Sequence, residues 1–175
     1  TSSMVDQIDK LASIASAFSN FAKMPSSNKV QLNLTETLEN ILFLYQSVNI
    51  KLFQAKVPVY IIGDNEQIIS VLNNLINNAI EASKENSIAE IVVRLGEEKN
   101  MAILSITDSG SGIPKEVQEK VFEPNFTTKN SGMGLGLAMA KQILTDLNGS
   151  IQFTSEENIG TTFYLSIPLL KQKTK

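Results

Sequence analysis

The sequence predicts an α+β fold in which helices cover one face of a mixed sheet. Segments with helical periodicity and short apolar segments typical of strands both occur along the chain. The strands come in adjacent hairpins and not in strict βαβ alternation, which favours this class. The chain has 175 residues, of which 42% are hydrophobic, so it can bury a real core.

The composition excludes several classes of function. The chain contains no cysteine and no histidine. This excludes disulfides, thiolate and imidazole metal ligands, imidazole general bases and Ser-His-Asp triads. A net charge of -3 gives no indication of nucleic-acid binding. No apolar run reaches the roughly 20 residues of a membrane span, and no signal peptide is visible, so we expect a cytoplasmic chain.

The first segment, residues 4–24, has the apolar spacing of an amphipathic helix, and Pro25 ends it. Its apolar stripe suits a helical hairpin or a two-stranded seam. We therefore expect a helical module at 1–27, a globular domain at 28–170 and a basic tail at 171–175. The chain does not begin with Met, which is consistent with a piece of a longer protein.

Alternating and periodic apolar patterns predict the elements of the domain. Asp64, with Gln67 three residues later, fits a capping box at the start of the longest helix. Pro58 suggests an edge strand or a strand start. The predicted elements are strands at 30–34, 50–55, 57–62, 91–95, 101–107, 151–155 and 161–168, a turn at 96–100, and helices from 35, at 65–84, at 115–120 and from the glycine-rich segment to 148–149.

A glycine-rich segment at 131–141 places Gly132, Gly134 and Gly136 at alternate positions before a helical pattern. Glycine allows a ligand to approach the backbone closely, and a helix N-terminus attracts anions, so the segment could bind phosphate. The spacing matches neither a dinucleotide fingerprint nor a Walker A loop. The alternative is a glycine-rich turn that caps an ordinary amphipathic helix.

The helix at 65–84 carries four asparagines within six residues, although asparagine is a poor helix former. Asn74 and Asn78 lie one turn apart on one face. Their amide oxygens could join a magnesium ion that already carries phosphates. The alternative, a solvated polar face, explains Asn73 and Asn77.

Asp108 ends an apolar strand and opens a loop that contains Gly110 and Gly112. Its carboxylate could accept a hydrogen bond from the amine of a base, and the two glycines would let a flat ring approach. The alternative is an Asx-turn, which aspartate forms readily. Further along, Thr128 and Lys129 precede the glycines in an irregular segment that could clamp a phosphate or act as a lid.

In their order along the chain, these motifs resemble the ATP-binding domain of sensor histidine kinases, a branch of the superfamily that includes gyrase B, MutL and the ninety-kilodalton heat-shock chaperone. The resemblance covers about residues 30–170. Residues 4–24 resemble the second helix of the dimerisation and phosphoacceptor hairpin. Residues 18–25 and 78–82 are similar to the nitrogen-regulatory subgroup. The matching motifs are the Asn-rich helix, Asp108-x-Gly110-x-Gly112, Phe122-Glu123-Pro124 with Thr127-Thr128-Lys129, and Gly132-x-Gly134-x-Gly136-Leu137.

The resemblance implies a two-layer α/β sandwich, the Bergerat fold, which binds Mg-ATP under a lid. Asn78 would ligate magnesium, and Asn74 would help to hold the metal or the phosphates. Asp108 would bind the adenine amine, and Thr161 would support it through a hydrogen bond or water. The remaining residues implied in ATP binding are Gly110, Gly112, Ile113, Thr128, Lys129, Gly132, Gly134, Leu135 and Gly136.

The implied function is transfer of the γ-phosphoryl group of ATP to a histidine, for relay to a response-regulator receiver domain. The implied partners also include a second copy, through the N-terminal helix, and the parent protein could be anchored in the inner membrane. The chain departs from the family pattern at three positions. Glu81 and Ala82 replace a lysine and an aromatic residue, and Asn125 replaces an aromatic residue, which is expected to loosen the lid.

The absence of histidine means that this chain cannot phosphorylate itself on a histidine. Two alternatives to the kinase remain at this point. One is a hydrolytic ATPase of the MutL or gyrase B type, whose base would stand at position 74. Asn74 cannot take a proton from water, which argues against it. The other is a regulatory module that binds nucleotide and transfers nothing.

Overall fold

The computed structural model describes residues 28–83, 90–127 and 133–170. The helix expected at 4–24 and the tail at 171–175 lie outside these ranges. No helix in the described ranges is both long and apolar enough to cross a bilayer. The elements are β1 (Val30–Asn33), α2 (Leu34–Phe43), β2 (Ile50–Gln54), β3 (Tyr60–Gly63), α3 (Asn65–Ser83), β4 (Ile91–Glu98), β5 (Met101–Asp108), η1 (Lys115–Lys120), α4 (Gly136–Asp146), β6 (Ser150–Glu156) and β7 (Gly160–Pro168).

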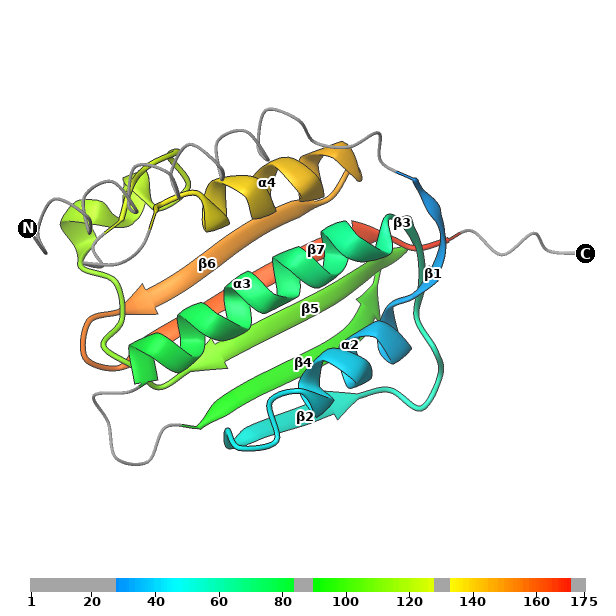
Figure 1. Ribbon diagram of the computed structural model, residues 1–175, viewed down its shortest axis with the longest axis horizontal. Helices are drawn as coiled ribbons and strands as arrows, with labels where there is room; N and C mark the ends of the chain where they lie inside the picture. Colours follow the sequence, from blue (N-terminus) through cyan, green and yellow to red (C-terminus); the bar gives the residue numbers. More distant parts are fainter. Residues whose placement is uncertain (1–27, 84–89, 128–132, 171–175) are drawn as a thin grey trace, which may run out of the picture.

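Five strands form the main sheet in the order β2-β4-β5-β7-β6. β2 runs parallel to β4, and the other neighbours are antiparallel, so the sheet is mixed. Figure 1 shows α2, α3 and α4 side by side on one face of this sheet. The α+β class and the two-layer arrangement are therefore confirmed.

A separate ribbon of β1 and β3 lies at one end of the sheet (Figure 1). The strand predicted at 57–62 begins later, at Tyr60, because Val59 is bonded elsewhere. Its N–H donates to Oγ1 of Thr35 at 2.9 Å, and its carbonyl accepts from the N–H of Leu34 at 2.8 Å. These bonds hold Val59 against the start of α2.

The apolar face of α3 packs into the centre of the core. Leu75 and Ile76 are completely buried, and burial of such side chains contributes roughly 1.5–3 kcal/mol each. That gain exceeds the cost of four asparagines, at roughly half a kcal/mol each. Packing thus decides that this segment is a helix. At its start, Asp64 Oδ1 accepts from the N–H groups of Glu66 at 3.0 Å and Gln67 at 3.2 Å, as the predicted cap requires.

Backbone geometry corrects one local prediction and specifies the helix type of another. The turn expected at 96–100 is shorter, because β4 extends to Glu98, which pairs with Met101. Lys99 and Asn100 form the turn, with φ angles of 49° and 66°, as in the two-residue turns whose twist matches a hairpin. The short helix expected at 115–120 is a 3₁₀ helix.

The predicted C-terminal end of α4 at Asn148 and Gly149 is confirmed, and the two residues have different roles. Asn148 takes the left-handed conformation, with φ of 56°, and the N–H of Gly149 donates to the carbonyl of Leu144 at 2.7 Å. A Cβ at Gly149 would lie 2.3 Å from the carbonyl oxygen of Ser166. Gly149 is therefore needed for close packing against β7, while asparagine makes the turn.

Candidate nucleotide site between α3 and α4

Asn74 of α3 meets the start of α4 at Gly136. A Cβ at Gly136 would stand 2.0 Å from Oδ1 of Asn74, so only glycine leaves room for this amide. Nδ2 of Asn74 is buried and has no hydrogen-bond partner among the described residues. A buried donor without an acceptor costs about 1–3 kcal/mol, which favours a ligand oxygen at this position.

Asn77 is exposed and Asn73 is partly buried, and the polar face they form also contacts Tyr45. Both side chains lie within hydrogen-bond distance of the hydroxyl of Tyr45, at 3.1 Å and 3.2 Å. Asn78, one turn after Asn74, is partly buried on the neighbouring flank of the helix. Asn74 and Asn78 each follow one of these two residues in the sequence, so they lie about 100° further around the helix than the pair that contacts Tyr45.

Asp108 is buried, with 6% of its surface exposed, at the end of β5. Its Oδ1 accepts from the N–H of Gly110 at 2.9 Å, which forms the Asx-turn that was the alternative interpretation. The same oxygen accepts from the N–H of Thr161 at 3.3 Å. Support of Asp108 by Thr161 was predicted, and in the structure it comes from the backbone. The Thr161 hydroxyl lies 2.9 Å from that of Ser155.

The glycines after Asp108 are required by the packing of the protein on itself. A Cβ at Gly110 would lie 2.5 Å from the carbonyl group of Ala82 at the end of α3. Gly112 has a φ of +69°, and a Cβ there would lie 2.1 Å from the carbonyl oxygen of Glu156. These glycines thus have a packing role, in which they let the loop touch α3 and β6. The approach of a flat ring to them stays a prediction.

Two polar residues that were not among the predicted site residues, Ser155 and Gln118, hold the end of this loop. The Ser155 hydroxyl accepts from the N–H of Ile113 at 2.8 Å. Nε2 of Gln118 donates to the carbonyl oxygen of Ile113 at 2.8 Å and lies 3.4 Å from that of Ser155. Ser155 could have been selected from the predicted hairpin of β6 and β7, in which it pairs with Thr161. No feature of the sequence distinguished Gln118.

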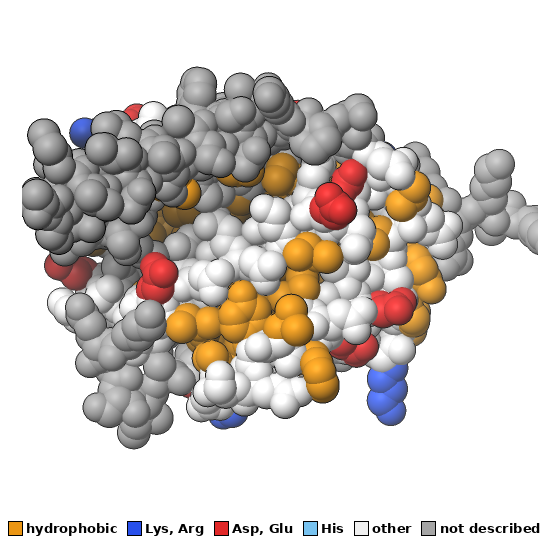
Figure 2. Space-filling model, viewed as in Figure 1, with side chains coloured by type: hydrophobic (Ala, Val, Ile, Leu, Met, Phe, Trp, Pro, Cys, Tyr) orange, Lys and Arg blue, Asp and Glu red, His pale blue; other side chains and the backbone are white. Residues whose placement is uncertain are grey.

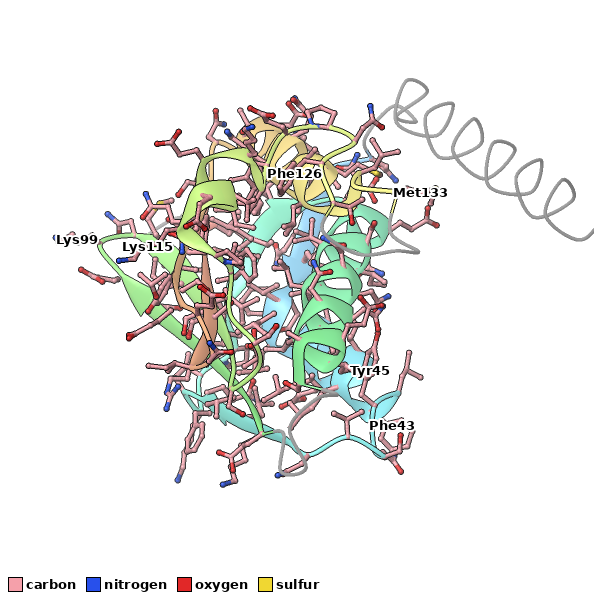
Figure 3. The ribbon with its side chains drawn as sticks, turned by 90° about the vertical axis from the view of Figure 1, so that its left-hand side faces the viewer. Phe43, Tyr45, Lys99, Lys115, Phe126 and Met133 are labelled. Carbon is pink, nitrogen blue, oxygen red and sulfur yellow. The ribbon has the colours of Figure 1, made fainter. Side chains whose placement is uncertain are left out.

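The segment that flanks the glycine-rich loop contains a further close contact. Gly134 has a φ of +66°, and a Cβ there would lie 2.5 Å from the carbonyl carbon of Asn125. Asn125 itself has a φ of 64°, which asparagine tolerates better than an aromatic residue does. Leu135 is buried and anchors the start of α4. Figure 3 shows Phe126 and Met133 on the two sides of this segment, close to α4. Thr128, Lys129 and Gly132 lie outside the described residues.

The chemistry of these groups fits a nucleotide with its own magnesium. The described residues contain no cluster of three or more acidic side chains that could hold a metal alone. Magnesium usually takes one or two protein oxygens and completes its shell with phosphates and water. The start of α4 has no side-chain N-cap, so its N–H groups suit an anion.

Residues 63–171 match the sequence family described as histidine kinase-, DNA gyrase B- and HSP90-like ATPase. This match covers more than half of the chain, and the chain belongs to that family. The solved catalytic domain of the histidine kinase ThkA superposes with a TM-score of 0.70 and 34% identity, over 81% of this chain and 95% of that one. The fold is thus that of a histidine kinase ATPase domain.

One further relative and a second structure of ThkA extend the comparison. The histidine-protein kinase AtoS of Escherichia coli is 32% identical over 97% of this chain, which spans only 29% of the length of AtoS. ThkA solved with the response regulator protein TrrA has a TM-score of 0.76 and 27% identity, over 94% of this chain and 48% of that one.

Proposed function

We propose that this chain is the catalytic portion of a two-component sensor histidine kinase. It binds Mg-ATP and donates the γ-phosphoryl group to a histidine carried by another segment or chain, because its own sequence has none. The observation that carries the proposal is the meeting of the Asn74 amide with Gly136 at an uncapped helix start. Motif similarity at 18–25 and 78–82 supports a nitrogen-regulatory-like subgroup.

Asp108 would recognise the adenine amine. Its Asx-turn holds the carboxylate in a fixed orientation, which lowers the entropy cost of binding a flat base. Gly110, Gly112 and Ile113 would line the pocket as backbone surface. The bonds from Ser155 and Gln118 to Ile113 support this role, because they fix the position of the loop.

The phosphates would lie where α3 faces α4. A phosphate oxygen would give the buried Nδ2 of Asn74 the acceptor it lacks. Asn78 would contribute an oxygen to the magnesium that ATP brings. N–H groups of the glycine-rich segment would complete the site, with Lys129 as a point charge. The other residues proposed to contact the phosphates are Thr128, Gly132, Gly134, Leu135 and Gly136.

This chain would therefore supply positioning and charge neutralisation, the usual share of the protein in phosphoryl transfer. A response-regulator receiver domain is the proposed downstream partner, supported by the pairing of ThkA with TrrA. We also propose that the chain pairs with a second copy through residues 4–24 and that it is located in the cytoplasm.

The competing activity is ATP hydrolysis of the MutL or gyrase B type. In that reaction a side chain must accept a proton from water, and an asparagine amide cannot do so. Asn74 occupies the corresponding position and is already in contact with Gly136. We expect slow hydrolysis, and fast steady-state release of phosphate by the purified chain would favour the ATPase instead.

The test is transfer in trans. The chain is incubated with γ-labelled ATP and a polypeptide that carries a phosphoacceptor helix of this family, with a His→Ala version of that polypeptide as the control. Label that appears on the histidine-containing helix alone supports the kinase. ATP binding without any labelling would support the regulatory module and contradict the kinase.

A further inference from the structure

Tyr45 connects the turn after α2 to the polar flank of α3. Its hydroxyl lies 3.1 Å from Oδ1 of Asn73 and 3.2 Å from Oδ1 of Asn77. These two asparagines are one helical turn apart, so a single phenol reaches both. In Figures 1 and 3, α2 and Tyr45 lie below α3, while α4 lies above it. α3 is therefore contacted by Tyr45 from one side and by Gly136 from the other.

Tyr45 is itself well fixed. Its N–H donates to the carbonyl of Leu42 at 3.0 Å, and its carbonyl accepts from the N–H of Val48 at 2.9 Å. Its ring is partly buried against the apolar core. The two preceding residues turn the other way, with Phe43 70% and Leu44 76% exposed. Figure 2 shows an apolar band over the region of α2 and the adjoining part of α3.

The position of Tyr45 affects the nucleotide side of α3 through helix geometry. Asn74 and Asn78 directly follow Asn73 and Asn77 in the sequence, so they lie about 100° further around the helix. A helix turns as a rigid body. A roll of about 10° would move an amide that lies roughly 5–6 Å from the helix axis by about 1 Å. Displacements of that size matter for a site that positions reacting groups.

Apolar packing alone leaves such a roll possible. The buried face of α3 is held by hydrophobic contacts, which have little directional preference. Hydrogen bonds depend on both distance and angle. The anchored hydroxyl can donate its one proton to either amide oxygen, and it therefore restrains the rotation of the helix with a directional bond that the apolar face does not supply.

Resting on the proposed function, we propose that Tyr45 is a positioning residue for the metal and phosphate end of the nucleotide. It acts through Asn73 and Asn77 and touches no part of the ligand. Asp108, which would bind the base, is held by the N–H groups of Gly110 and Thr161 at the end of β5. Loss of the hydroxyl should therefore affect the two ends of ATP differently.

The test compares two ligands by calorimetry on the purified chain. Tyr45→Phe keeps the ring and removes the hydroxyl. We expect Mg-ATP to bind about threefold to tenfold more weakly, as for the loss of one or two hydrogen bonds, while adenosine binds with unchanged affinity. Tyr164→Phe is the matched control. Tyr164 lies on β7, 41% exposed, and its variant should bind both ligands as the original chain does.

A second comparison tests whether Tyr45 acts through Asn73 and Asn77. In a chain with Asn73→Ala and Asn77→Ala, the Tyr45 hydroxyl has lost these two partners, so adding Tyr45→Phe should cause no further loss of Mg-ATP affinity. Additive losses would contradict action through the asparagines. Thermal unfolding of each variant identifies a general loss of stability, which would weaken both ligands alike.

The outcomes separate the two proposals. Equal weakening of Mg-ATP and adenosine, or no change in either, overturns the role of Tyr45 while the proposed function stands. If the unaltered chain binds neither ligand, the proposed function fails and the role of Tyr45 fails with it.

Discussion

The side-chain amide of Asn74 occupies the space in which a Cβ of residue 136 would stand, 2.0 Å from its Oδ1. The contact joins the middle of α3 to the first residue of α4. Two motifs that lie 62 residues apart in the sequence (74 and 136) thereby form one site. Glycine is needed at position 136 to leave room for the Asn74 amide, whether or not a ligand is bound. A substitution at this position should therefore act through Asn74.

Gly136→Ala should displace the Asn74 amide. The amide is the end of a side chain and can move, and alanine raises helix propensity by about 1 kcal/mol, so we expect little change in the unfolding free energy. Mg-ATP affinity should fall by about tenfold or more, because the amide leaves its position. Gly96→Ala is the control, since nothing lies within 4 Å of a Cβ there. Equal affinities for both variants would contradict this role of Asn74.

Asp108→Asn should weaken adenine binding. The substitution keeps the size of the side chain but replaces a charged acceptor by a neutral amide, and hydrogen bonds to charged groups contribute about 1.5–3 kcal/mol. We expect ATP and adenosine to lose about tenfold to a hundredfold in affinity, measured by calorimetry. Asp146→Asn, at the exposed end of α4, should leave both affinities unchanged. An unaltered affinity in the Asp108 variant would remove Asp108 from the base site.

Asn125 should respond to substitution according to its φ of 64°. Glycine and asparagine accept this conformation, whereas a β-branched residue costs about 1–2 kcal/mol in it. Asn125→Gly should therefore unfold at nearly the original denaturant concentration, and Asn125→Val should lose about that free energy. The same stability in both variants would show that the conformation is not maintained in solution. The prediction that Asn125 loosens the lid stays untested.

Ser155→Ala should destabilise the loop after Asp108. The change removes the acceptor of the part-buried Ile113 N–H, 2.8 Å away. An unsatisfied donor costs about 1–3 kcal/mol when fully buried, and we expect the lower part of that range here. Chemical denaturation should show a loss in this range and weaker adenosine binding. Thr154→Ala, the exposed neighbour on β6, should show neither effect. Weaker binding with full stability would mean that Ser155 contacts the ligand directly.

Much of the fold follows from the apolar pattern. The periodic face of α3, with Leu75 and Ile76 completely buried, and the hairpin of β6 and β7 were both predicted, because each element has a strong internal period. Predictions were less accurate where tertiary bonds decide the local structure. The bonds of Val59 to α2 delayed the start of β3, a shift for which no pattern in its own segment gave a signal.

The residues of the candidate site could be predicted from the sequence, but most of the contacts between them could not. Asp108 and Asn74 could be selected as polar residues in costly or unusual positions. The reasons for Gly110, and the bonds that Tyr45 makes to α3, depend on residues 28 or more positions away. Such contacts are set by the packing of helices on the sheet, and a single sequence contains no direct record of them.

The most direct test of the central claim is calorimetric titration of the purified chain with ATP, with and without magnesium. We expect binding in the micromolar to millimolar range that is stronger with magnesium and is greatly weakened by Asp108→Asn. Absence of binding heat for ATP and ADP with magnesium present, from a chain shown to be folded by its thermal transition, would contradict the account.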